Sequence, residues 1–187
     1  MTTSNISGNR TQARQSIPPA ITWQLTSFNE LSGYQVYHII QAREQVFVKD
    51  QHCTYIDADG LDIDAMHLSG YLTAYQDDKA IDSKDNQNVN PPLVAYCRIL
   101  TSTAPQCYPI IGRVLVVADY RGFGLARELM LRAIEYCHLH FPNQPIHLSA
   151  QTYLTQFYES LGFVCAGDVY SAEGIEHVHM ILAAHQT

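Results

Sequence analysis

The stretch from Ile111 to Met130 constrains the fold most, because it reads as a strand, a glycine turn and a helix in direct succession. Residues 111–117 are mostly β-branched or Leu, which is typical of a strand buried on both faces. Apolar side chains then recur at helical spacing, at Leu125, Leu129, Ala133 and Ile134. Gly122 and Gly124 lie between the two elements and can adopt backbone angles closed to other residues.

The start of this predicted helix is suited to bind an anion. Its first N–H groups lack partners within the helix, and the helix dipole adds partial positive charge there. We therefore interpret the turn as a phosphate site. The phosphate-loop pattern Gly-x-x-x-x-Gly-Lys-Ser/Thr does not occur, and Arg127 stands where the dinucleotide pattern Gly-x-Gly-x-x-Gly needs its third glycine. An ordinary glycine turn without a ligand is the alternative.

Two motifs in this order resemble those of the GNAT superfamily of acyl-CoA-dependent N-acyltransferases. Residues 121–126, Arg-x-x-Gly-x-Ala after a Val-rich strand, resemble its pyrophosphate loop. Residues 148–163, ending Phe-Tyr-Glu-Ser-Leu-Gly-Phe, resemble a later motif in which a strand leads into a short helix. The resemblance spans residues 23–182. It is closest to the ElaA-like branch, through Arg-Glu-Gln-Val-Phe-Val at 43–48 and Asp-Ala-Asp-Gly-Leu-Asp at 57–62.

The resemblance implies an α/β fold with a central, twisted, mostly antiparallel mixed sheet and helices on both faces. A single domain would span residues 21–187, behind a flexible tail at residues 1–20 that is polar and aperiodic. Acetyl-CoA is the implied cosubstrate. The residues implied to bind it are Val114, Leu115, Val116, Arg121, Gly122, Phe123, Gly124, Leu125, Ala126, Arg127 and Gln151.

Tyr158 takes the place of the tyrosine that many members of this family use as a general acid. A phenol is protonated at neutral pH and can give its proton to a departing thiolate. The alternative is an aromatic side chain that only packs on the helix face. Gln151 stands where many relatives have an Asn near the pantetheine or phosphate, so an amide is retained.

The acceptor side is less defined. Five aspartates lie within residues 50–64, and we expect Asp59, Asp62 and His67 to contact an amine substrate. A solvated acidic loop is the alternative. A calcium site is not supported, because the spacing does not match an EF-hand loop and its bidentate Glu is absent. No metal is expected.

The sequence does not decide the general base. The strand at residues 146–150 carries no Glu, the residue that some relatives use there. Histidine changes charge near neutral pH, so His67, His147, His177 and His179 are candidates, although a structural role is common for such residues. Deprotonation through ordered water, aided by Asp59 or Asp62, is equally compatible.

The remaining elements follow from periodicity and turn residues. Strands are predicted at 23–28, 65–75, 93–100, 146–150, 163–170 and 177–182, and helices at 31–47, 125–140 and 151–161. A surface loop is expected at 76–92. The turn at Glu173-Gly174 predicts that the last two strands form a hairpin.

Charge and composition restrict the partners. The formal charge is −7 with only 11 Lys plus Arg, which argues against nucleic acid and anionic membranes and suits a cationic amine slightly. No apolar run approaches the roughly 18 residues of a membrane span, and no signal peptide is indicated, so we expect a cytoplasmic protein. Five dispersed Cys suggest reduced thiols.

The sequence thus predicts an N-acetyltransferase that moves an acetyl group from acetyl-CoA to a primary amine of a small molecule or peptide by direct attack. Residues 43–50 also resemble the acyl-homoserine-lactone synthases, although the basic patch needed for an acidic carrier protein is missing. A third alternative is a non-catalytic module that binds acyl-CoA as a sensor. A homodimer is also considered, since dimers are common in the GNAT superfamily.

Overall fold

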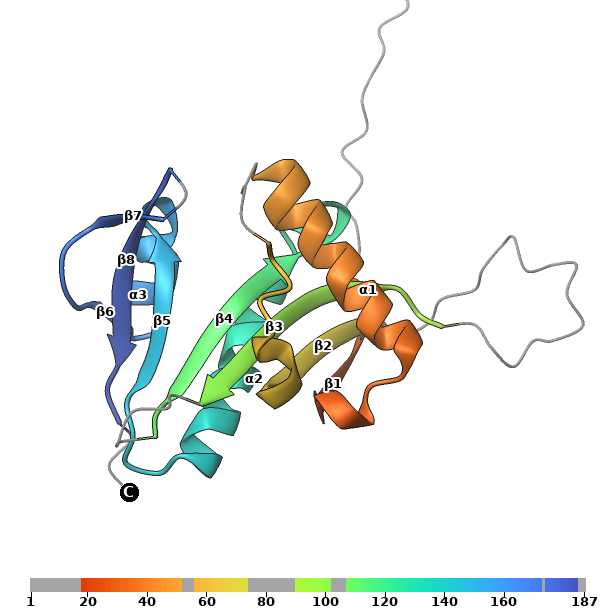
Figure 1. Cartoon of the computed structure of the whole chain (residues 1–187), viewed down its shortest axis with the longest axis horizontal. Helices are drawn as coiled ribbons and strands as arrows, with labels where there is room; N and C mark the ends of the chain where they lie inside the picture. The colour runs from red at the N-terminus through yellow and green to blue at the C-terminus, as the bar shows by residue number, and fades with distance from the viewer. Residues whose placement is uncertain (1–17, 52–55, 74–89, 102–106, 173, 185–187) are drawn as a thin grey trace, which may run out of the picture.

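A computed structural model describes residues 18–51, 56–73, 90–101, 107–172 and 174–184. The strands are β1 (Ile21–Ser27), β2 (Met66–Leu72), β3 (Leu93–Thr101), β4 (Pro109–Val116), β5 (Ile146–Gln151), β6 (Val164–Cys165), β7 (Tyr170–Ala172) and β8 (Ile175–Leu182). They form one eight-stranded sheet in the order β1-β2-β3-β4-β5-β8-β6, with β7 also paired to β8 (Figure 1). All pairs are antiparallel except β4 with β5. The predicted mixed, mostly antiparallel sheet is confirmed.

Three α-helices accompany the sheet in the described part of the chain, and the predicted cover on both of its faces is confirmed (Figure 1). They are α1 (Gly33–Arg43), which continues into the π-helix η2 (Glu44–Asp50), α2 (Leu125–His140) and α3 (Thr155–Glu159). Short 3-10 turns are η1 (Phe28–Glu30), η3 (Leu61–Asp64), η5 (Ala118–Tyr120) and η6 (Thr152–Leu154). Ser32 begins α1 as its N-cap, because its side chain accepts a hydrogen bond from the N–H of Gln35.

The strand β3 supplies side chains to the buried layers on both faces of the sheet. Ala95 and Cys97 pack with α2, whereas Tyr96 between them packs with α1 and η2. This alternation follows from the pleat, which directs successive side chains to opposite faces. Both faces of β3 are therefore buried, which accounts for the continuous apolar run that predicted this strand.

Two predicted elements differ from the structure. The short helix begins at Thr155 rather than at Gln151, because Gln151 still pairs with His177 across β5 and β8. The single strand expected at 163–170 is wrong: it is replaced by β6 and β7, with Gly167 between them at a φ of 110°.

Two further predictions are confirmed, and two others concern residues that lie mostly outside the described ranges. The end of α2 at His140 and the hairpin of β7 and β8 are confirmed. The predicted tail and the predicted loop at 76–92 fall mostly outside the described residues. Within the described residues, no helix is long and apolar enough to cross a membrane.

Gly70 allows β1 and β2 to pack closely. It pairs with Trp23, and a Cβ added at Gly70 would lie 2.7 Å from Cζ3 of the Trp23 ring. The ring cannot easily withdraw, because its Nε1 donates a 2.7 Å hydrogen bond to Oε1 of Glu128 on α2. Trp23 thereby connects the edge of the sheet to the long helix.

Gly70→Ala should therefore lower the free energy of unfolding by roughly 1–3 kcal/mol through overpacking. Gly33→Ala is the matched control, since a Cβ at Gly33 meets nothing within 4 Å, and its stability should change by less than about 1 kcal/mol. Urea unfolding of both variants measures the difference. Equal stabilities would contradict the close packing of Trp23 on Gly70.

Candidate active site

The site begins where β4 and β5 separate. These parallel strands pair only through Ile110 and His147, and their ribbons diverge toward their C-terminal ends (Figure 1). In β4, Arg113 and Val114 both fall opposite the single residue Cys97 of β3, which is a β-bulge. Arg113 has a positive φ of 53° at this point. The bulge leaves the edge of β4 free to face a cavity instead of a strand.

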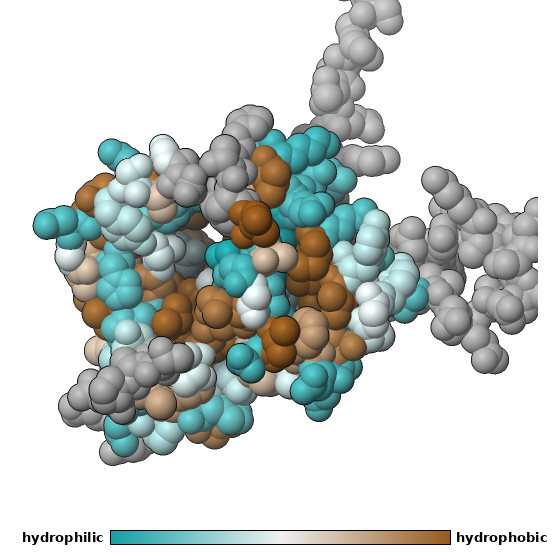
Figure 2. Space-filling model, in the orientation of Figure 1, coloured by the Kyte–Doolittle hydropathy of each residue, from teal (hydrophilic) through white to brown (hydrophobic). Residues whose placement is uncertain are grey.

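The larger cavity, of about 480 Å³, lies along this free edge of β4. Strand, turn and helix residues contribute to its wall. They are Val46, Asp50, Gln51, Val114, Leu115, Val116, Arg121, Ala126, Tyr153, Leu154, Phe157 and Tyr158. Figure 2 shows that hydrophobic residues gather in the middle of this face, between β5 and α1. An extended, partly apolar ligand such as a pantetheine arm suits these walls.

The glycine turn before α2 leaves main-chain donors open. Gly122 and Gly124 have φ values of 85° and 79°, and a Cβ added at either would meet nothing within 4 Å. The carbonyl of Gly124 accepts hydrogen bonds from the N–H groups of Arg127 and Glu128, so bonding within the helix begins there. The N–H groups before Arg127 are therefore placed to bind an anion.

The side chains of this turn stabilise the protein around it. Arg121 donates a 2.9 Å hydrogen bond from Nε to the carbonyl of Val116, which fixes the end of β4. Arg127 donates from Nη1 to Oγ of Ser160 at 3.0 Å and thereby joins α2 to the end of α3. Leu125 is buried in the core, and Phe123 is half-buried against it. The turn thus offers an anion mainly its backbone.

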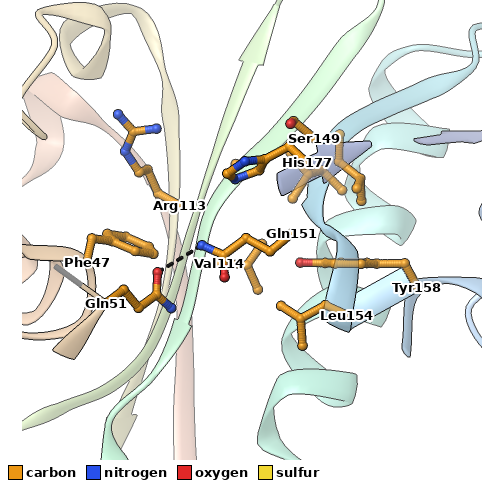
Figure 3. Close-up of a pocket in the computed structure, with 12 residues that line it drawn as sticks. Phe47, Gln51, Arg113, Val114, Ser149, Gln151, Leu154, Tyr158 and His177 are labelled. Carbon is orange, nitrogen blue, oxygen red and sulfur yellow. Dashed lines mark hydrogen bonds between the residues drawn. The ribbon is translucent and has the colours of Figure 1, made fainter. Parts of the chain in front are cut away.

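A second, smaller cavity of about 120 Å³ lies farther along the same gap (Figure 3). It is lined by Phe47, Gln51, Ile111, Gly112, Arg113, Val114, Leu148, Ser149, Gln151, Leu154, Tyr158 and His177. Val114 and Tyr158 line both cavities. A hydrogen bond of 3.0 Å from Nε2 of Gln151 to Oε1 of Gln51 crosses the gap (Figure 3).

Tyr158 presents its hydroxyl to the gap between β4 and β5 (Figure 3). The residue is only 6% exposed, and its ring packs edge-on against Phe163 and Phe157. Burial raises the pKa of the phenol, because the charged phenolate would be poorly solvated there. The hydroxyl is therefore protonated at neutral pH.

An ion-pair network lies beside the smaller cavity. Arg43 is fully buried and donates hydrogen bonds of 2.6 Å to both Asp57 and Asp62. Arg98 binds both carboxylate oxygens of Asp59 at 2.7 Å. Further ion pairs join Arg98 to Asp62, Arg113 to Asp57 and Arg113 to Asp59. The six residues carry equal numbers of positive and negative charges.

The arginines determine the ionisation of these aspartates. Hydrogen bonds from Arg98 hold the pKa of the Asp59 carboxyl well below its usual range. Burial raises the pKa of Asp62, but hydrogen bonds from Arg43 and Arg98 outweigh it and leave the pKa below its ordinary value. Both carboxylates are charged and occupied, which makes them poor proton acceptors.

The structure places the three residues expected on the acceptor side away from both cavity walls. Asp59 and Asp62 belong to the ion-pair network, and His67 is only 1% exposed. Nε2 of His67 lies 2.9 Å from the carbonyl of Asp62, and Nδ1 lies 2.8 Å from the hydroxyl of Tyr96. Burial lowers the pKa of His67, which favours its neutral form.

Sequence reasoning missed the arginines of this network. Arg98 lies within a strand whose neighbours are apolar, and a charged residue there is rarely buried without a partner. That pattern could have indicated a buried ion pair, but not which aspartates form it. Arg113 carries the network to the wall of the smaller cavity.

The remaining candidate bases differ in whether they line a cavity. Nδ1 of His147 lies 2.9 Å from Nε2 of His179, and the ring of Tyr108 stacks on His147. Of the four candidate histidines, only His177 lines either of the two cavities, and it lies in the wall of the smaller one. The described residues contain no group of three His, Cys, Asp or Glu that could hold a metal ion.

Comparison with known proteins identifies the family. The model of the GNAT acetyltransferase domain matches residues 86–184. The protein ElaA of Escherichia coli is 38% identical over 162 residues, which cover 86% of this chain and 95% of ElaA. The chain therefore belongs to the GNAT acetyltransferase family, as its motifs indicated.

Solved structures agree with this assignment. The crystal structure of E. coli ElaA has a TM-score of 0.73 at 36% identity and covers 87% of this chain and 99% of its own. An acyl-CoA N-acyltransferase from Pseudomonas aeruginosa has a TM-score of 0.72 at 31% identity and covers 88% of this chain and 100% of its own. The GNAT fold predicted from the sequence is confirmed, and the chain is an acyltransferase by family.

Arg43→Met should lower the free energy of unfolding by about 3–5 kcal/mol, because it removes a guanidinium and leaves two buried carboxylates undercompensated. Arg132→Met is the control: Arg132 forms an exposed ion pair with Glu128 one helical turn away and lies 5.3 Å from the centroid of the Trp23 ring, and the loss of both contacts should cost about 1–2 kcal/mol or less. Urea unfolding at neutral pH measures both. Similar losses in the two variants would contradict the stabilising role of the buried network.

Proposed function

We propose that this protein transfers an acetyl group from acetyl-CoA to a primary amine of a small molecule or peptide, by direct attack of the amine on the thioester. The observation that carries the proposal is the continuity of the site. The free edge of β4 leads from the open main-chain donors at the start of α2 to Tyr158, and Val114 and Tyr158 line both cavities. Membership in the GNAT family supports the same reaction class.

In this proposal, backbone N–H groups between Gly122 and Arg127 bind the pyrophosphate of the cofactor. Residues 114–116 of β4 contact the pantetheine arm in the larger cavity, and Gln151 lies near its reactive end. The thioester then lies beside Tyr158. The hydrogen bond between Gln51 and Gln151 crosses the same gap, so one or both amides would exchange it for contacts with the cofactor.

The chemistry requires few groups from the protein. The uncharged amine attacks the thioester carbon, and main-chain N–H groups of β4 stabilise the oxyanion that forms. The carbon–sulfur bond then breaks, and the Tyr158 hydroxyl gives its proton to the departing thiolate. The products are the acetylated amine and CoA.

The two other functions considered have less support. A CoA-dependent acyl-homoserine lactone synthase has a TM-score of 0.66 with this chain at 16% identity, which shows a common fold alone. A sensor that only binds acyl-CoA would not need an acid beside the thioester. The position of Tyr158 therefore favours an enzyme.

Gly124→Gln should weaken acetyl-CoA binding at least about tenfold, or roughly 1.4 kcal/mol, because a side chain would occupy the space at the anion-binding donors. Gly174→Gln is the matched control: its φ of 80° equals that of Gly124 within a degree, and a Cβ there also meets nothing within 4 Å. Isothermal titration with acetyl-CoA measures both. No binding by the unmodified protein at tens of micromolar would refute the proposed function.

Tyr158→Phe should lower kcat by about a hundredfold and leave the Kd for acetyl-CoA within about twofold, since the ring is kept and only the acid is lost. Tyr136→Phe on α2 is the control and should behave like the unmodified protein. A screen of amines by release of the CoA thiol identifies an acceptor for the measurement. Unchanged turnover in Tyr158→Phe would remove this residue from the mechanism.

A further inference from the structure

The proposed reaction has an acid but still lacks a proton acceptor. An amine reaches the site mostly as its ammonium form, so its nitrogen must lose one proton before it can attack and a second as the amide forms. A side chain that accepts protons directly from the amine must lie in the wall of the cavity that receives the amine. The inference drawn here rests on the proposed function and completes its proton balance.

Most of the candidate general bases already have hydrogen-bond partners within the protein. The carboxylates of Asp59 and Asp62 accept hydrogen bonds from arginines. Both ring nitrogens of His67 have partners. His147 and His179 face each other and do not line either cavity. Of the four candidate histidines, this leaves His177, which lines the smaller cavity.

His177 is held in one tautomer by its own strand. It lies near the start of β8, and its Nδ1 is 2.9 Å from the carbonyl oxygen of Ile175. A carbonyl oxygen only accepts hydrogen bonds, so Nδ1 carries the proton and Nε2 of the neutral ring has a free lone pair. The ring also stacks on Tyr170, at 5.9 Å between centroids.

The position of the ring suits an attack on the thioester. His177 lines the smaller cavity together with Val114, Tyr158 and Gln151, and Figure 3 shows its ring directed into the gap between β4 and β5. Tyr158 reaches the same gap from α3. An amine between the two side chains would have an acceptor for its proton on one side and the thioester on the other.

We propose that Nε2 of His177 is the general base of the acetyl transfer. It first takes the ammonium proton and passes it to water, and it then takes a second proton from the nitrogen as the nitrogen–carbon bond forms. Tyr158 gives one proton to the sulfur as the carbon–sulfur bond breaks. The imidazolium then loses its proton to water, and Tyr158 regains one from water. The net reaction of an ammonium substrate releases one proton, so charge and atoms balance.

Other titratable groups surround His177. Arg113 approaches from β4, Tyr158 from α3 and Tyr170 from β7, and His179 lies two residues along the same strand face. The Arg113 guanidinium is paired with Asp57 and Asp59, which offsets its charge. The imidazole must be neutral to accept a proton, and the pairing of Arg113 keeps an uncompensated positive charge away from it.

The test compares the variant His177→Asn with the control His179→Gln. The amide of Asn at position 177 can still donate to the Ile175 carbonyl, but it has no atom equivalent to Nε2. Release of the CoA thiol is followed with the fastest amine of the screen. It is also followed with water as the acceptor, because hydrolysis of acetyl-CoA needs the same base and water does not titrate near neutral pH. Binding of acetyl-CoA is measured separately by isothermal titration.

His177→Asn should lower kcat about a hundredfold with the Kd for acetyl-CoA unchanged within about twofold, and the rate of acetyl-CoA hydrolysis should fall by a similar factor. His179→Gln should keep the rates of both acetyl transfer and hydrolysis. Added imidazole should restore part of the activity of His177→Ala, which a purely structural role would not predict.

A His177→Asn enzyme that binds acetyl-CoA and catalyses both acetyl transfer and hydrolysis within about threefold of the unmodified rates would overturn this assignment. Failure of imidazole to raise the rate of a folded His177→Ala would also count against it. Absence of acetyl-CoA binding by the unmodified protein would instead refute the proposed function, so the two failures are distinguishable.

Discussion

One extra residue in β4 determines the geometry of the whole site. Arg113 and Val114 of β4 share a single partner on β3. Because of this bulge, β4 bends away from β5 after Ile110, where the two strands pair. Without this bulge, β4 and β5 could continue their parallel pairing, and the backbone groups that face the cavity would bond to each other. Both cavities, and the access of Tyr158 to them, depend on this separation.

The ion-pair network stabilises the bulge. Arg113 has a φ of 53°, a left-handed conformation that costs a residue with a Cβ roughly 1–2 kcal/mol. Its guanidinium donates hydrogen bonds to Asp57 and Asp59, and these carboxylates also bind Arg43 and Arg98. The strained residue is thus fixed by Asp57 and Asp59 from the segment before η3, and Arg43 on α1 and Arg98 on β3 hold these two aspartates in turn. The network connects the first helix to the strand that would carry the thioester.

The predictable parts of this protein are local. The strand, glycine turn and helix at 111–140 follow from apolar periodicity and from two glycines, and each of these signals acts over a few residues. The network joins residues up to 56 positions apart, and no local pattern pairs them. Gly112 inside an apolar strand was a visible sign of the bulge, since glycine within a strand often marks one. The position of His177 required the sheet register, because the sequence offered four equivalent histidines.

The charge of the site differs from that of the chain as a whole. The sequence carries a formal charge of −7, and the aspartates at 57–62 suggested an acidic attraction for a cationic amine. In the structure, three arginines offset the charges of Asp57, Asp59 and Asp62, so the excess of negative charge lies elsewhere on the molecule. An ammonium ion gains little from a neutralised wall, whereas an uncharged amine loses little by leaving water there. In the proposed reaction, the same pairing that fixes the bulge would therefore favour the uncharged, nucleophilic form of the amine, and its protons would go to His177, which lies outside the network.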